Sequence, residues 1–183
     1  MAEQVSTAVP DYVIRIREDM VRSGLIPLDG VLGNGTSTLF LTELLFSERC
    51  KAKDITVILN SQGGYTTEAF AIHDIVRAHK LNVMVTGLAA SGASMLVLQA
   101  GKKRIAYPNA QFMLHEIGWG FQGKMSEQND EQKQAAKLQQ RVLSVLSERT
   151  GHTPKEILKL IGRKDHWMSA QEAIEWGLID EIR

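Results

Sequence analysis

The spacing of hydrophobic and polar residues divides the chain into strand-like and helix-like segments that alternate. The β-branched run at residues 54–60 predicts a buried parallel strand, and the apolar positions along one side of residues 66–79 predict a helix. The order then repeats, with a strand expected at 83–87 and a buried helix at 91–100. Strands and helices in regular alternation predict an α/β fold with parallel strands and right-handed crossovers.

Further elements are expected on both sides of this central region. An apolar run at 25–32 is interrupted by Pro27 and Gly30, so the pattern assigns no element to it. No linker divides the chain, and residues 1–183 are therefore expected to form a single domain. The remaining expected elements, in chain order, are an amphipathic segment at 12–22, a buried helix at 36–48, short strands at 104–107 and 111–114, helices at 154–161 and 169–176, and a final strand at 178–182.

A long helix is predicted at residues 126–149, and Gly151 provides its C-cap. A Gly-rich and aromatic stretch at 118–123 precedes it. The first half of the helix has almost no apolar side chain. Because a helix that is polar all round projects into solvent or packs against another subunit, this one is not expected to lie in the core.

Composition narrows the classes of function. Lys and Arg total 21, and so do Asp and Glu, so binding of nucleic acid or of a membrane through excess positive charge is not expected. Cys50 is the only cysteine, which excludes an intrachain disulfide and a Cys-based zinc site. Residues 1–11 lack the regions of a secretory signal and are expected to be flexible. The uncharged stretch at 81–101 contains several glycines and polar residues, unlike a membrane span, and a cytoplasmic location is expected.

Ser91 is the first candidate for chemistry, because it lies where a predicted strand gives way to a helix. A lone serine at that place is most often an N-cap. The small residues around it favour a nucleophile on a sharp turn, with the backbone N–H of Gly92 as a donor to an oxyanion. Ser94, one helical turn further on, is the weaker alternative. The glycines of the 60–64 turn follow the neighbouring strand, and ligands bind beyond strand ends of this kind.

A nucleophilic serine needs a base and an acid that orients it. Of the five histidines, His115 ends a predicted strand and is expected at the same sheet edge as Ser91. A histidine at a strand end is often structural, so position alone does not decide its role. Asp165 and Asp180 are equal candidates for the orienting acid.

Several of these segments together resemble one known family. The segment Gly87-Leu-Ala-Ala-Ser91 resembles the G-x-A-A-S nucleophile segment of ClpP, the proteolytic subunit of the Clp protease. Residues 107–115 resemble its L-P-N…M-(I/L)-H segment, residues 164–180 its R-D-x-x-(M/L)-S-A…G-L-(I/V)-D tail, and residues 60–64 its N-S-P-G-G turn. The similarity extends from about residue 12 to the C-terminus, and the order and spacing of the segments make it specific.

The resemblance implies a Ser–His–Asp triad of Ser91, His115 and Asp165, with oxyanion-hole N–H groups from Gly64 and Gly92. It implies a serine endopeptidase that needs no cofactor, ATP being used only by a partner ATPase of the Clp unfoldase type. It also implies the ClpP/crotonase-type fold of repeated β-β-α units with a parallel sheet. Residues 116–150 would form a protruding handle, a strand plus the long helix, that joins two stacked rings of seven subunits around a chamber for polypeptide substrates.

The sequence departs from the family pattern at several places, and two other functions stay open. Gln62 replaces the proline of the S-P-G-G turn, Ile117 replaces the proline of H-Q-P, and the segment before Tyr12 is short, so the contact with an ATPase is in question. A ring subunit without activity is one alternative function. A crotonase-like enzyme, which uses two backbone N–H groups on an acyl-CoA thioester but no serine–histidine pair, is the other.

Overall fold

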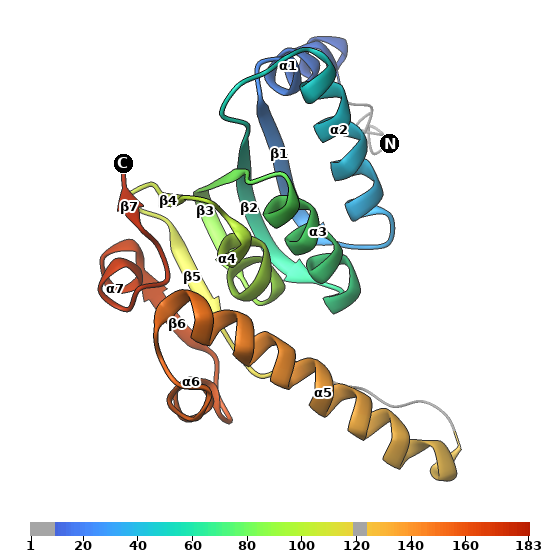
Figure 1. Cartoon of the computed structure of the whole chain (residues 1–183), viewed down its shortest axis with the longest axis vertical. Helices are drawn as coiled ribbons and strands as arrows, with labels where there is room; N and C mark the ends of the chain where they lie inside the picture. Colours follow the sequence, from blue (N-terminus) through green and yellow to red (C-terminus); the bar gives the residue numbers. More distant parts are fainter. Residues whose placement is uncertain (1–9, 119–123) are drawn as a thin grey trace, which may run out of the picture.

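Seven strands form one sheet in the computed structural model, which describes residues 10–118 and 124–183 (Figure 1). Strands β1, β2, β3, β4 and β7 lie side by side in that order, and each neighbouring pair is parallel. β3 pairs with β4 along its first half and with β5 along its second half, and β6 runs antiparallel to β5. The strands are β1 (Leu25–Leu32), β2 (Thr56–Gly64), β3 (Asn82–Ala90), β4 (Arg104–Ala106), β5 (Gln111–Leu114), β6 (His166–Ser169) and β7 (Glu181–Ile182).

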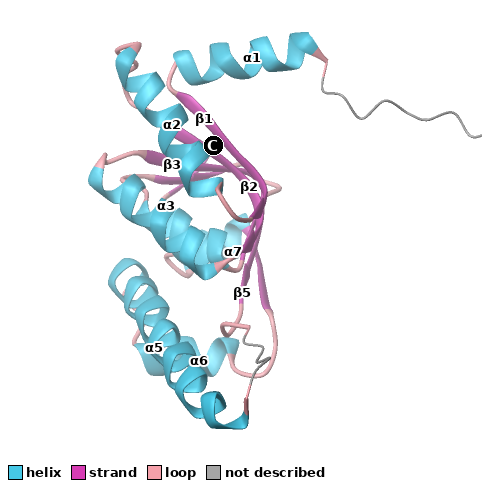
Figure 2. Ribbon diagram, turned by 90° about the vertical axis from the view of Figure 1, so that its right-hand side faces the viewer, coloured by secondary structure: helices cyan, strands magenta, loops and turns pink. Residues whose placement is uncertain are grey.

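Helices connect the parallel strands, as the alternating pattern predicts. Figure 2 shows α2 and α3 on the same face of the sheet. Between β3 and β4 the chain forms a buried π-helical segment, η1, which continues as the short α-helix α4. The helices are α1 (Asp11–Arg22), α2 (Thr36–Arg49), α3 (Thr66–Ala78), η1 (Ala93–Val97), α4 (Leu98–Ala100), α5 (Met125–Thr150), α6 (Pro154–Ile161) and α7 (Ala170–Glu175).

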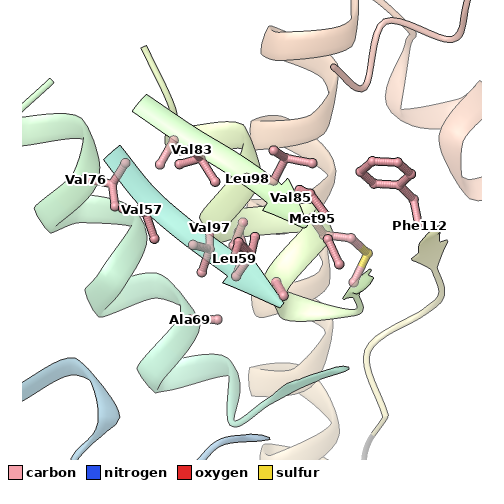
Figure 3. Packing of buried hydrophobic residues seen from close by; sticks show 14 of the residues in the cluster. Val57, Leu59, Ala69, Val76, Val83, Val85, Met95, Val97, Leu98 and Phe112 are labelled. Atoms are coloured by element: carbon pink, nitrogen blue, oxygen red, sulfur yellow. The ribbon is translucent and has the colours of Figure 1, made fainter. Parts of the chain in front are cut away.

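The core fills the layer between the central strands and the helices (Figure 3). The β-branched and leucine side chains of β2 and β3 that point into this layer are fully buried, and so is the inward face of α3. Burial of one such side chain is worth about 1.5–3 kcal/mol, so the alternating pattern of the two strands fixes which face they turn to the helices. The main contributors are Val57, Leu59, Ala69, Val76, Val83, Val85, Val97 and Leu98.

The structure differs from the sequence expectations in several elements: strand β6 was not expected, and β7 is shorter than the strand expected at 178–182. The run at 25–32 is strand β1, and it tolerates Pro27 because it lies at the sheet edge, where a missing N–H breaks no ladder on the open side. β2 extends through Gly64, where a turn was expected, because Gly63 and Gly64 still pair with β1. The helix α2 is not fully buried: Leu39 and Leu45 are 54% and 52% exposed.

The long helix α5 extends away from the sheet (Figures 1 and 2). Its second half packs through Val142, Leu143 and Leu146, which are buried, and Gly151 ends it with a positive φ of 79°. The described side chains of residues 128–134 are exposed, as their polarity predicts. Residues 1–9 and 119–123, which include most of the expected flexible terminus and of the expected Gly-rich stretch, lie outside the described residues. Among the described residues, no helix combines the length and hydrophobicity of a membrane span.

Candidate active site

Ser91 occupies the sharp turn between β3 and the π-helical segment. Its backbone N–H donates to the carbonyl of Met113 at 2.9 Å, and its own carbonyl accepts from the N–H of Met95 at 2.9 Å. Its φ of 54° lies in the left-handed region that side-chain-bearing residues rarely adopt. Strained residues of this kind are held by their surroundings and are frequent at active sites. The turn directs the hydroxyl of Ser91 away from the helix that follows and toward β5.

His115 directly follows β5, and its Nε2 lies 2.6 Å from Oγ of Ser91. The pairing of strands β3 and β5 explains why these two side chains are close. β5 pairs in parallel with the end of β3, so that Ala90 and Met113 stand side by side and the two chains leave the sheet at the same edge. The structure thus brings together the serine and the histidine that the sequence placed at this edge.

A crevice of about 200 Å³ opens beside this pair. Gly64 and Gly92, the predicted donors to an oxyanion, both line it. The end of β2 passes close to the turn that carries Ser91: a Cβ on Gly63 would lie 2.8 Å from Cβ of Ser91, which only glycine avoids. The rest of the wall is largely apolar and is formed mainly by Met95, Leu96, Ile117 and Val142.

Two polar side chains at the end of β2 hold the surrounding backbone, and the sequence pattern did not single them out. Oγ of Ser61 donates to the carbonyl of Gly30 at 2.6 Å and accepts from the N–H of Gly63 at 3.1 Å. Oδ1 of Asn60 accepts from the N–H of Leu88 at 2.9 Å, where the register between β2 and β3 shifts. Their signals in the sequence were a polar break after a buried strand and the resemblance of residues 60–64 to the N-S-P-G-G turn.

Ser94, the weaker candidate nucleophile, is fully buried. Its Oγ lies 2.6 Å from the carbonyl oxygen of Met113 and 3.0 Å from that of Ser91. A hydroxyl held in this way braces the turn and is not presented to the crevice. The geometry therefore favours Ser91 over Ser94 as the reactive hydroxyl.

The two candidate acids lie in different surroundings. Leu114 of β5 pairs with His166 of β6, so Asp165 stands across from His115 one step beyond this antiparallel pair. Asp165 is exposed and has no hydrogen bond or ion pair with any described residue. Asp180 instead forms an ion pair with Arg104, which also donates its backbone N–H to Oδ2 of Asp180 at 2.8 Å. The strand register thus favours Asp165 over Asp180 as the neighbour of His115, although no hydrogen bond joins Asp165 to His115.

Three of the other four histidines contact groups away from Ser91, and the fourth, His166, pairs with Leu114 in the sheet. Nδ1 of His73 lies 2.9 Å from Asp74, and Nδ1 of His79 lies 2.7 Å from Glu48. The ring of His152 stacks on Trp176 with 4.6 Å between centroids. Within the described part of the chain, no three His, Cys, Asp or Glu side chains are grouped so that they could hold a metal ion.

Comparison with models of known protein families matches residues 9–183 to the family described as Clp protease. The match contains every residue of the site described above. It confirms the family that the sequence segments resemble, and the parallel α/β sheet agrees with the fold which that resemblance implies.

Proposed function

The chain belongs to the Clp protease family, and on this premise we propose that it is a serine endopeptidase that hydrolyses peptide bonds through an acyl-enzyme on Ser91. The observation that carries the proposal is the 2.6 Å contact between Oγ of Ser91 and Nε2 of His115. A crotonase-like reaction would need the two glycine turns but not this pair.

The geometry supports a reaction in two halves. Nε2 of His115 accepts the proton of the Ser91 hydroxyl while Oγ attacks the carbonyl carbon of the peptide bond. The N–H groups of Gly64 and Gly92 then donate to the carbonyl oxygen as it becomes negative. The imidazolium gives its proton to the leaving amine, and a water molecule, deprotonated by His115, hydrolyses the ester. The peptide bond is broken and the serine hydroxyl is restored.

Asp165 is proposed as the group that orients His115. Asp165 lies one step beyond the Leu114–His166 pair, on the stretch of chain that runs opposite His115. A carboxylate there would hold the tautomer whose Nε2 can accept the serine proton, and would stabilise the imidazolium that forms. The exposed carboxylate has no competing partner among the described residues.

The assembly is proposed by family membership and supported by the shape of α5. Members of the family generally form rings, and α5, with the exposed residues 128–134, extends from the body, where it can contact a second ring (Figure 1). Two stacked rings of seven would enclose the crevices in a chamber for unfolded polypeptides, with a Clp-type ATPase as a further partner. Gln132→Pro should break this helix and yield single rings or monomers by mass photometry; an unchanged mass would contradict the role of α5.

The reactivity of Ser91 provides the test of the proposed activity. A fluorophosphonate probe should label the purified protein on Ser91, and a fluorogenic peptide should be cleaved. Ser91→Ala should abolish labelling and reduce cleavage to background, whereas Ser94→Ala should leave labelling intact. Cleavage by Ser91→Ala at the rate of the unchanged protein would refute the assignment. An assembled protein that the probe does not label would indicate a ring subunit without activity.

A further inference from the structure

The long helix α5 contacts the segment that follows the candidate base through the side chain of Gln139. Oε1 of Gln139 accepts a hydrogen bond from the backbone N–H of Ile117 at 2.7 Å. Ile117 lies two residues beyond His115, and both residues line the crevice beside Ser91. This hydrogen bond, between residues 22 positions apart, thus joins α5 to the segment that follows His115.

The segment 115–118 has no regular secondary structure that would hold its backbone in place. β5 ends at Leu114, and residues 115–118 lie in neither a helix nor a strand. Backbone groups outside regular structure need partners from elsewhere, and Gln139 provides one at Ile117. Because the backbone direction at His115 determines where its ring lies, a fixed point two residues further on restrains the imidazole.

The amide nitrogen of Gln139 indicates that this residue is not there to stabilise the fold. Its Nε2 is buried and has no hydrogen-bond partner among the described residues. A buried donor without a partner is destabilising, and an apolar side chain of similar size would fill the same space without one. What the glutamine adds is the acceptor for the N–H of Ile117.

We propose that Gln139 is a positioning residue that keeps the imidazole of His115 within reach of the Ser91 hydroxyl, by anchoring the N–H of Ile117 to α5. The inference rests on the proposed function, because it gives His115 the role of base. Gln139 does not line the crevice, so it acts through the backbone and not on the substrate.

The first test compares two variants of Gln139 in the full-length protein. Gln139→Met keeps the size of the side chain and removes the acceptor, whereas Gln139→Glu keeps an acceptor oxygen. We expect Gln139→Met to slow fluorophosphonate labelling of Ser91 about five- to tenfold, the effect of one lost hydrogen bond, and Gln139→Glu to stay within about twofold of the unchanged protein. In peptide cleavage the loss should lie in kcat, with KM nearly unchanged. Equal labelling rates for the unchanged protein and Gln139→Met would overturn the inference.

A double-mutant cycle tests whether Gln139 acts through the N–H of Ile117. Ile117→Pro removes that donor and will change the crevice as well, but this second effect is common to both arms of the cycle. In the Ile117→Pro background, Gln139→Met has no hydrogen bond left to break and should change labelling less than about twofold. A slowing as large as in the unchanged background would show that Gln139 acts by another route.

Hydrogen exchange gives a readout that does not depend on activity. The Ile117 amide of the unchanged protein should exchange at least about tenfold more slowly than a free amide, and Gln139→Met should remove this protection. Rapid exchange at Ile117 in the unchanged protein would refute the inference even if every variant misfolded. Failure of the probe to label the unchanged protein, with Ile117 protected, would instead contradict the proposed function.

Discussion

Asp180 and Asp165 belong to two regions of the molecule that surround a carboxylate in opposite ways. Asp180 accepts hydrogen bonds from the guanidinium of Arg104, among them one from Nε at 3.1 Å, and a further one from its backbone N–H. Asp165 stands across from His115, is exposed, and has no such contact with any described residue. The carboxylate of Asp180 is held by several hydrogen bonds, whereas that of Asp165 has no partner among the described residues.

The surroundings of Arg104 explain why Asp180 is bound so tightly. The side chain of Arg104 is only 7% exposed, and its remaining N–H groups donate to Oε1 of Gln99 and to the carbonyl of Gly177. Burial alone would raise the pKa of Asp180, but the hydrogen bonds and the charge of Arg104 outweigh it and lower that pKa below its ordinary value. A buried guanidinium needs such a counter-charge. Asp180 is therefore part of a structural ion pair, which makes it the poorer of the two candidates for the proposed orienting acid.

The largest expected effect is that of Asp165→Asn on turnover. If Asp165 orients His115, the neutral amide of the asparagine lacks the charge that stabilises the imidazolium. The amide also favours the wrong tautomer of the imidazole. The rate of peptide cleavage should then fall about 10³- to 10⁴-fold. The free energy of unfolding, measured by urea denaturation, should change by less than about 0.5 kcal/mol, because an exposed carboxylate without a partner contributes little.

The reverse pattern of effects would contradict the roles assigned to Asp165 and Asp180. Loss of turnover in Asp180→Asn at unchanged stability, with normal turnover in Asp165→Asn, would mean that the two aspartates have been assigned the wrong way round.

Asp180→Asn should have the next largest effect, and on stability instead of chemistry. The substitution leaves the guanidinium of Arg104 buried without its counter-charge, beside the further positive charge of Arg149, whose pKa is lowered by burial and by Arg104. Breaking a buried pair in this way costs about 3–5 kcal/mol, and we expect about 3 kcal/mol because the side chain of Asp180 is itself 40% exposed. Urea denaturation at pH 7 measures this loss of unfolding free energy.

Arg104→Met is the matched control, because it removes the buried charge together with the pair. It should destabilise the protein less than Asp180→Asn does, and an equal or larger loss would show that the other hydrogen bonds of Arg104 carry the effect.

The pH dependence should separate the two regions further. The pKa of Asp180 is lower in the folded chain than its ordinary value of 3.8. The unfolded chain therefore takes up this proton first as the pH falls, and the contribution of Asp180 is complete above about pH 4 and lost as the pH falls through the folded pKa. The difference in unfolding free energy between the unchanged protein and Asp180→Asn should shrink between pH 4 and pH 2. A constant difference would contradict the ion pair as its cause.

What the sequence predicted correctly depended on strong local patterns. The β-branched residues of β2 and β3 can hardly be placed except in a buried strand, and parallel strands that end at one edge bring Ser91 and His115 to the same place. The choice between two serines followed from how deep each lies in its helix, and the buried Oγ of Ser94 agrees with it.

What the sequence missed depended on contacts between distant segments. β1 was not assigned because the pattern cannot show that Pro27 lies at a sheet edge. The exposed side of α2 could not be predicted, because its apolar residues face in more than one direction. The two aspartates looked alike because Arg104, 76 positions away from Asp180, becomes its neighbour only when β4 and β7 pair.

A third aspartate, Asp130, tests whether an ion pair without burial contributes to the free energy of unfolding. Asp130 lies among the exposed residues 128–134 of α5 and forms an ion pair with Lys133 at 3.1 Å, both side chains being more than 70% exposed. Water screens such a pair, and ordering two flexible side chains offsets most of the attraction. Asp130→Asn should therefore change the free energy of unfolding by less than about 0.5 kcal/mol. A loss close to that of Asp180→Asn would mean that the charge of the pair, and not the burial of Arg104, makes Asp180 a structural residue.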